Sequence, residues 1–353
     1  MLGRGRAGLL ALAVVLAAAA CTLERTPSGL GPPFLEVVGW TRVADLRATT
    51  PPSWSPTAPR LAFATHEGIW VAGLSGEPRR VAALPGVTRV AWRRGGSSVL
   101  ALAGGRLLDV PVGDAGAATQ VVATGVRAFA EAPDGRRIAL VTVEGGRDAV
   151  RLVGPGSGGR LGQAVAIPPG WGVRGLTWAT SRDLLLALGR GPSGFAERVA
   201  RLTLGSPRPL HLQAWISLGR PTPRLEVSPG ARFLAYVVPP PPGGDGGQSV
   251  AVQRQDGTGR RILGPPGRIL GLAWSPSGTV LALARRRGQD RASLELVDVT
   301  TGLGAPVGEY RPETSPTAGP VSLAWAPSGR ALAVGPGPGQ PPDPVWVVLL
   351  RRR

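Results

Sequence analysis

The chain has no lysine, and it contains only two histidines and one cysteine among its 353 residues. Without lysine, the Gly-x-x-x-x-Gly-Lys loop that holds nucleotide phosphates cannot be present. The single cysteine, Cys21, excludes an internal disulfide bond. His66 and His211 lie far apart, neither has a partner at the spacing of a metal site, and no Gly-x-Ser-x-Gly nucleophile elbow occurs. We therefore expect no metal, no cofactor and no catalysis by this chain.

Aromatic residues are also few, and ten of the seventeen are tryptophan. The sequence has no obvious row of aromatic residues for stacking against sugars, so a binder of glycans or wall polymers ranks below a binder of proteins. The formal net charge is +18, which invites a nucleic-acid interpretation. Because every basic residue is Arg in a chain rich in Ala, Gly and Pro, we attribute the charge to a G+C-rich coding sequence and expect no nucleic-acid partner.

A short phrase returns seven times along the chain. It consists of a small apolar strand, a turn written Ser-Pro-x-Gly or a degenerate form of it, and a strand rich in Leu and Ala. Successive copies are separated by roughly 38 to 51 residues, the range of propeller blades and repeat arrays. The seven copies are centred on Trp54, Trp92, Pro133, Trp178, Pro229, Trp274 and Trp325. Five of these positions carry Trp, which we interpret as core anchors.

The first copy shows how one repeat is built. Pro52–Trp54, Leu61–Ala64, Ile69–Ala72 and Arg79–Leu84 are predicted strands, joined by turns of Gly, Pro and Ser. The second strand is apolar on both faces, as in strands that are buried on both sides. Its alternation of large and small residues suits the tapered packing of neighbouring sheets. Each repeat therefore predicts one four-stranded antiparallel blade.

The last repeat has only three strands before the chain ends. Near the N-terminus, Thr41–Leu46 resembles the outer strand Arg79–Leu84 and precedes the first repeat. We predict that residues 41–46 complete the seventh blade, which would remove the open sheet edge that an incomplete blade exposes. The predicted fold is thus all-β, a single propeller of seven four-stranded blades closed by an N-terminal strand.

The phrase Trp-Ser-Pro-x-Gly, followed by Leu61–Ala64 and Ile69–Val71, resembles the WD40-like repeat of the TolB family. The same repeat occurs in the C-terminal domain of LpqB-type lipoproteins. The resemblance covers residues 41–350 and implies the propeller fold. The chain departs from the family because the usual Asp of the turn remains only at Asp134, and because the additional domains of TolB and LpqB have no room here. A shared fold does not transfer a function.

The first 20 residues have the pattern of a targeting segment. Arg4 and Arg6 precede the apolar stretch Ala7–Ala20, which is too short for a comfortable membrane span. Small residues before Cys21 resemble a bacterial lipobox, in which the cysteine is lipidated; an ordinary secretory signal is the alternative. Residues 1–20 are thus a predicted signal peptide, residues 21–33 a lipidated Cys with a flexible tether, and residues 34–353 the propeller.

Four loops between second and third strands stand out as a candidate binding rim. Two are rich in proline and two carry arginine, and loops on a rigid scaffold commonly bind partners. The predicted rim consists of Arg190, Pro240, Pro241, Arg285, Arg286, Arg287 and Pro338. Tolerated surface insertions are the alternative interpretation of these loops.

These patterns predict a monomeric, extracytoplasmic lipoprotein of the cell envelope that binds or scaffolds an unknown envelope protein. Its contact with the membrane would be the lipid anchor at Cys21. The alternative is a propeller enzyme, such as a hydrolase or lyase using Glu or Asp, or a small-molecule binder, with its site at the central channel.

Overall fold

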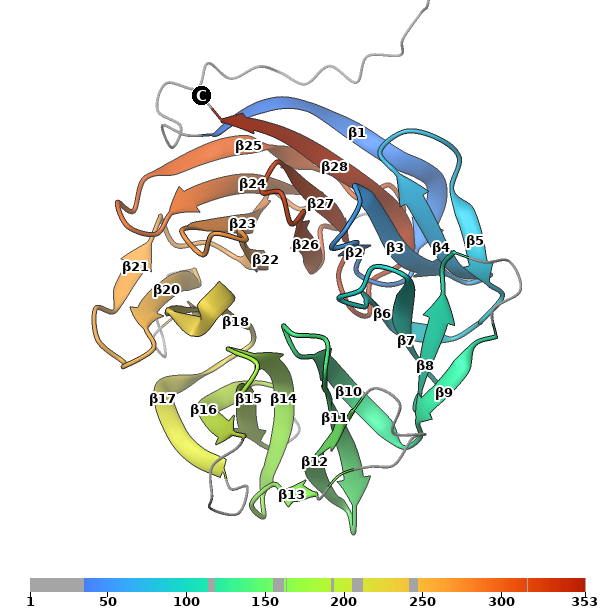
Figure 1. The fold of residues 1–353 in the computed structure, drawn as a ribbon. Coiled ribbons are helices and arrows are strands. Elements are labelled where there is room, and N and C mark those ends of the chain that lie inside the picture. The colour runs from blue at the N-terminus through green and yellow to red at the C-terminus, as the bar shows by residue number, and fades with distance from the viewer. Residues whose placement is uncertain are drawn as a thin grey trace, which may run out of the picture.

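In the computed structural model, the chain forms a ring of seven antiparallel sheets around a common centre (Figure 1). The structure describes residues 35–352 except 114–117, 155–161, 163, 192–193, 205–211, 241–246 and 316. Cys21, Pro241 and His211 therefore lie outside the described residues. Within the described part, each sheet has four strands, which confirms the predicted propeller of seven blades.

The first three blades follow one another along the chain. They contain β2 (Ser53–Trp54), β3 (Arg60–Thr65), β4 (Gly68–Gly73) and β5 (Arg79–Ala82); β6 (Val87–Trp92), β7 (Ser98–Ala103), β8 (Arg106–Pro111) and β9 (Gln120–Ala123); and β10 (Val126–Glu131), β11 (Ile138–Glu144), β12 (Arg147–Val153) and β13 (Val165–Ala166).

The next three blades repeat this order, with a short 3-10 turn, η1 (Pro229–Ala231), after the first strand of blade five. They contain β14 (Trp171–Trp178), β15 (Asp183–Arg190), β16 (Ala196–Thr203) and β17 (Leu212–Thr222); β18 (Leu225–Val227), β19 (Phe233–Val238), β20 (Ser249–Arg254) and β21 (Arg261–Leu263); and β22 (Ile269–Trp274), β23 (Val280–Arg287), β24 (Arg291–Asp298) and β25 (Gly304–Tyr310).

Blade seven joins the two ends of the described chain. It contains β26 (Val321–Trp325), β27 (Ala331–Pro336), β28 (Asp343–Arg352) and, as its outer strand, β1 (Leu35–Ala48). Thr41 and Arg42 of β1 lie opposite Val347 and Trp346 of β28, which confirms the predicted closure. The strand is longer than residues 41–46, and its register shifts between Arg42 and Arg47. Figure 1 shows β1 and β28 side by side at the outside of the ring.

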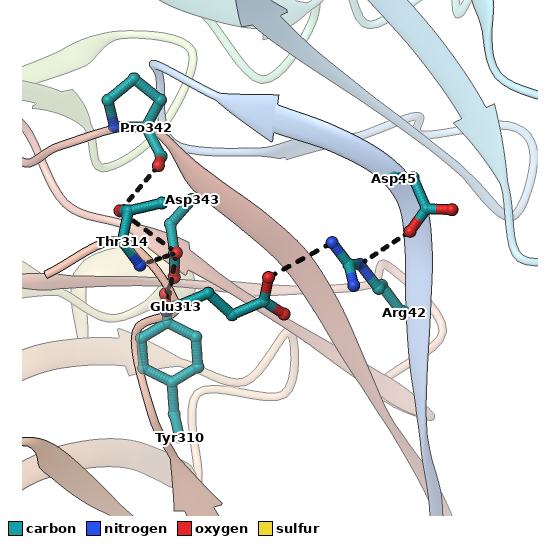
Figure 2. Close-up of polar contacts among 7 residues, drawn as sticks. All are labelled: Arg42, Asp45, Tyr310, Glu313, Thr314, Pro342 and Asp343. Atoms are coloured by element: carbon teal, nitrogen blue, oxygen red, sulfur yellow. Dashed lines mark hydrogen bonds and ion pairs between the residues drawn. The ribbon is translucent and has the colours of Figure 1, made fainter. Parts of the chain in front are cut away.

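Polar contacts reinforce this closure where blade six meets blade seven (Figure 2). The carboxylate of Asp343, which is 2% exposed, accepts hydrogen bonds from the Tyr310 hydroxyl and from the backbone N–H groups of Glu313 and Thr314. Burial and the bond to Asp343 raise the pKa of Tyr310. Arg42 of β1 pairs with Glu313 at 3.4 Å. The closing strand is therefore tied to the connection between two blades as well as to β28.

Seven hydrophobic clusters form the core, one at each interface between neighbouring blades of the described chain. In blade six, Leu281 and Leu283 pack toward blade five, whereas Ala282 and Ala284 pack toward blade seven. The alternation of large and small residues therefore serves two interfaces, as predicted. Blade two reverses it, because Leu100 and Leu102 face blade three and the smaller residues face blade one.

The last residue of the Ser-Pro-x-Gly turn is glycine because of the backbone conformation at that position. In five blades this glycine has a left-handed backbone conformation, with φ between 67° and 71°, which residues with a Cβ rarely adopt. The five residues are Gly96, Gly135, Gly230, Gly278 and Gly329.

The five repeat tryptophans are at most 9% exposed, which confirms them as core anchors. Four of them also connect blades, because each indole N–H donates to a backbone carbonyl on the inner strand of the preceding blade. The donor–acceptor pairs are Trp54 to Ala324 (2.8 Å), Trp178 to Ala130 (2.9 Å), Trp274 to Glu226 (3.2 Å) and Trp325 to Ala273 (3.2 Å). The indole N–H of Trp92 is buried and has no hydrogen-bond partner among the described residues. In its own blade, each acceptor residue stands one position before the repeat Trp or before the residue that takes its place.

Candidate functional site

The predicted rim residues that the structure describes all lie at the ends of second strands. Arg190 ends β15, Pro240 follows β19, Arg285–Arg287 end β23, and Pro338 follows β27. Because the second strands of all blades run in the same direction, these ends share one face of the ring. The described rim residues therefore lie on one face of the ring, and their role in binding stays a prediction.

Arg285, however, is not part of an accessible rim, since only 7% of it is exposed. It donates to the carbonyls of Leu263 (3.1 Å) and Pro265 (2.7 Å), which end blade five, and pairs with Glu295 at 3.3 Å. Gly264 leaves the space for the guanidinium, because a Cβ there would lie 2.6 Å from Arg285 Nη2. Arg285 follows Leu281 and Leu283 on the strand face toward blade five, so it joins two blades.

The other rim arginines form hydrogen bonds, ion pairs or ring contacts within the protein. Arg286 donates to the carbonyl of Ala318 before blade seven. Arg287 is exposed and pairs with Glu309 at 3.2 Å. Arg190 pairs with Glu197 at 3.0 Å and lies over the ring of Trp171. Pro338 is exposed, and Pro240 is half-buried.

A second group of charged residues lies at the central channel. The inner strands of the seven blades surround the centre of the ring (Figure 1). On each inner strand, one residue stands before the repeat Trp position, and on five of the seven strands this residue lines a cavity at the centre. We call these seven residues the channel ring: Ser53, Ala91, Ala130, Thr177, Glu226, Ala273 and Ala324. Six are small, and only blade five contributes a charged side chain.

One mouth of the channel is hollowed into a cavity of about 390 Å³. Five members of the channel ring contribute to its wall, together with Arg89, Arg94 and Phe129. The turns after the first strands also reach it, through Pro56 and Pro327. This mouth is therefore on the face opposite the predicted rim.

The carboxyl group of Glu226 is partly buried. Burial raises its pKa to about 7, although the nearby guanidinium groups of Arg224 and Arg89 act in the opposite direction. Burial in turn lowers the pKa of both arginines, and the charge of Glu226 partly offsets that effect. Solvent reaches both groups, because Arg89 is exposed and Glu226 is partly exposed.

The charges of Glu226 and Arg89 have no partner within hydrogen-bond or ion-pair distance among the described residues. Arg89 comes from β6 on one wall of the channel, and its guanidinium lies 5.0 Å from the centre of the Phe129 ring. Glu226 belongs to β18 on the opposite wall. Arg224, two residues before Glu226, makes one long hydrogen bond of 3.4 Å to the carbonyl of Val321 in blade seven. The charged groups that line the channel cavity itself are Arg89, Arg94 and Glu131.

Other charged side chains of the inner strands have partners within the protein. Glu131 stands at the Trp position of blade three and pairs with Arg93 at 2.7 Å. Arg127 pairs with Asp148, and Arg174 donates to the carbonyl of Gly191. Among the charged side chains of the described inner strands, Arg89 and Glu226 differ from these because they have no hydrogen-bond or ion-pair partner.

Sequence reasoning missed these two residues because it looked for chemistry in loops. A signal was present, since the residue before the repeat Trp is Ser, Ala or Thr in six copies and Glu226 in blade five. Aligning the copies by their turns would have exposed that exception. No alignment could have shown that Arg89 lies across the channel from it.

Two searches with the sequence found no relative: no family model matches, and no curated protein matches. Solved structures do match in shape. An oligogalacturonate lyase in complex with manganese has a TM-score of 0.66 at 11% identity, covering 88% of this chain and 90% of its own. A chain of a mitotic checkpoint complex has a TM-score of 0.59 at 14% identity, with 90% and 95% covered. At these identities the likeness shows the propeller fold alone.

TolB from Acinetobacter baumannii also matches, with a TM-score of 0.46 at 14% identity. The match covers 72% of this chain and 62% of the TolB chain, so the chain spans less than two thirds of that protein. In the described part of the chain, no helix is both long and apolar enough to span a bilayer.

Proposed function

We propose that this protein is an extracytoplasmic binding propeller, anchored by a lipid at Cys21, that holds a small ligand at the mouth of its central channel and performs no reaction of its own. The anchor proposal is supported by Arg4, Arg6 and the apolar stretch before Cys21. Incorporation of a labelled fatty acid tests it. The label should enter the full chain and be absent from Cys21→Ser.

The observation that carries the binding proposal is the unpaired charge in the channel. Charged groups taken out of bulk water without partners are costly, and proteins normally pair them. Here the fold pairs Glu131, Arg127 and Arg190 but leaves Arg89, at the wall of a cavity, without an ion-pair partner among the described residues. A ligand that supplies hydrogen-bond or ion-pair partners would offset the free-energy cost of the unpaired charge when it binds.

A blocked channel tests this proposal. Ala130→Trp would fill the cavity with an indole while leaving the backbone bond to Trp178 intact. Val143→Trp adds the same side chain at a position that is 56% exposed, and it serves as the matched control. In a thermal-shift screen of small metabolites, the wild type and Val143→Trp should share stabilising compounds that do not stabilise Ala130→Trp. Compounds that stabilise all three proteins equally, or none that stabilise the wild type, would contradict the proposal.

A protein partner on the predicted rim is the second candidate. It is favoured by the exposed Pro338 and Arg287, which share one face and are carried by rigid strands. Crosslinking in native envelopes, with Arg190→Ser and Arg287→Ser compared with the wild type, tests this candidate without disturbing Arg285. A discrete protein captured by the wild type and lost in both variants supports the rim.

A further inference from the structure

The turns that join the first and second strands of the blades lie together on the face of the ring that holds the channel mouth, which we call the turn face. It is formed by residues 55–59, 93–97, 132–137, 179–182, 228–232, 275–279 and 326–330. Neighbouring turns touch one another. Arg137 Nη1 donates to the carbonyl of Ser181 in the next blade at 3.5 Å, and a Cβ on Gly135 would lie 3.3 Å from the Cβ of Arg94. Side chains from separate blades therefore share one continuous surface.

Exposed arginines are concentrated on the turn face. Its turns contain one acidic residue, Asp134, and seven arginines. One of these, Arg93, pairs with Asp109 and Glu131, each at 2.7 Å. The other six are exposed, and none forms an ion pair with a described residue: Arg94, Arg136, Arg137, Arg182, Arg232 and Arg330. Five blades thus contribute positive charge that the described part of the protein leaves unpaired.

The loops on the opposite face, between second and third strands, have a different composition. They contain no arginine, and Glu67 and Asp290 are among their residues. Arg287, which ends β23 beside one of these loops, is paired with Glu309 at 3.2 Å. The turns therefore present more unpaired positive charge than these loops, and an anionic surface is attracted to the turn face.

The closing strand β1 begins on the turn face. Leu35, its first residue, lies opposite Arg352 at the end of β28. The backbone N–H of Leu350 donates to the carbonyl of Arg330 at 2.8 Å, which places this end of β28 beside the turn of blade seven. Thirteen residues separate Cys21 from Leu35, and a flexible linker of that length spans about 20 Å. A lipid at Cys21 would therefore hold the turn face closer to the bilayer than the opposite face.

We infer that the turn face docks onto anionic lipid headgroups of the membrane that holds the anchor, with the channel mouth toward the bilayer. The inference rests on the proposed anchor at Cys21. Each arginine close to an anionic membrane surface strengthens binding about fivefold, and a basic patch supplies the second signal that stable anchoring by a lipid chain requires. The opposite face, with Pro338 and Arg287, then points away from the membrane, where a protein partner can reach it.

Single dye labels on the full-length protein test this orientation. Cys21 is the only cysteine and would be blocked by the lipid, so a cysteine introduced at the exposed Ser97 of the turn face, or at Val143 near the opposite face, takes the dye alone. The protein is placed in vesicles of phosphatidylcholine, with or without phosphatidylglycerol, whose headgroups carry a quencher. We expect quenching of Ser97→Cys in the anionic vesicles, little in the neutral ones, and a loss of quenching at high salt. Val143→Cys should be quenched in neither.

A labelling control separates failure of the anchor from failure of the docking. If the wild-type protein takes up the dye, Cys21 carries no lipid and the anchor proposal is wrong. The same two labels in the Cys21→Ser background then test the turn face by itself. Quenching at Ser97→Cys alone, in anionic vesicles alone, still supports the docking, and its absence overturns it.

Two charge-matched variants test whether the turn arginines are responsible. The first carries Arg136→Gln, Arg182→Gln and Arg330→Gln; the second carries Arg106→Gln, Arg147→Gln and Arg287→Gln, at exposed positions near the opposite face. The first should lower the ratio of docked to undocked protein roughly 100-fold, and the second should leave it unchanged. An equal loss in the two variants, equal quenching of both labels, no quenching at Ser97→Cys, or quenching that depends on neither lipid charge nor salt would each overturn the inference.

Discussion

At the scale of single residues, Glu226 is an ionisable side chain held where burial disfavours its charged form. An acid whose pKa is raised in the folded state binds more protons when folded than when unfolded between the two pKa values. Its contribution to stability is therefore complete below pH 4.5 and is lost as the pH rises through about 7. The carboxylate persists at this cost, which agrees with a role in binding.

The variant Glu226→Gln should show this cost directly. At pH 3.5 its free energy of unfolding should match the wild type, because Glu226 is then protonated in both the folded and the unfolded state. At pH 8 the variant should be more stable by about 2 kcal/mol, since it avoids ionisation in the channel. Denaturant unfolding at the two pH values measures the difference. A variant that is equally stable or less stable at pH 8 would contradict the assignment.

The repeat tryptophans allow a matched test of the bonds between blades. Trp54 and Trp92 are equally buried at the same repeat position, but only the indole N–H of Trp54 has a partner. Replacement by Phe removes similar volume from both sites. Trp54→Phe should therefore cost about 1 kcal/mol more than Trp92→Phe, which is the worth of a buried hydrogen bond. If both variants lose the same free energy of unfolding in urea, the tryptophans stabilise the protein through packing alone.

At the scale of secondary-structure elements, the second strands decide how neighbouring blades fit. Their apolar alternation was predictable because each face packs against another blade. The sequence analysis did not predict that the same alternation continues into the charged residues at the end of a strand, as it does in β23. Arg285 continues the Leu face toward blade five and Arg286 continues the Ala face toward blade seven. Both side chains therefore bond to neighbouring blades, and only Arg287 points to solvent.

This difference predicts unequal effects of the same substitution on one strand. Arg285→Ser leaves Glu295 and two carbonyls without their partner, so it should lower the free energy of unfolding by about 2–4 kcal/mol. Arg287→Ser loses one exposed ion pair and should change it by less than about 0.5 kcal/mol. Chemical denaturation of the two variants measures both. Similar stability of the two variants would show that Arg285 is not a structural link.

At the scale of the whole molecule, β1 determines whether the ring is closed. Without it, β28 would expose a long and mostly apolar edge, which is a template for aggregation. A chain that starts at residue 35 should unfold cooperatively and remain monomeric, whereas one that starts at residue 49 should aggregate. Light scattering and thermal unfolding compare the two. Addition of a peptide of residues 35–48 should rescue the shorter chain, and a soluble, stable shorter chain without peptide would argue against closure by β1.

The sequence by itself determined the all-β propeller, its seven blades, the closing strand and the buried tryptophans. These features follow from local patterns, because strand period, turn glycines and repeat spacing are all written within one copy of the repeat. The tertiary structure alone decided which charges stay free. Arg89 and Glu226 belong to blades two and five, and they come within electrostatic range of each other only because ring closure places those inner strands on opposite walls of one channel. Likewise, Arg285 is buried because the end of blade five supplies its partners, which no local pattern around residue 285 could indicate.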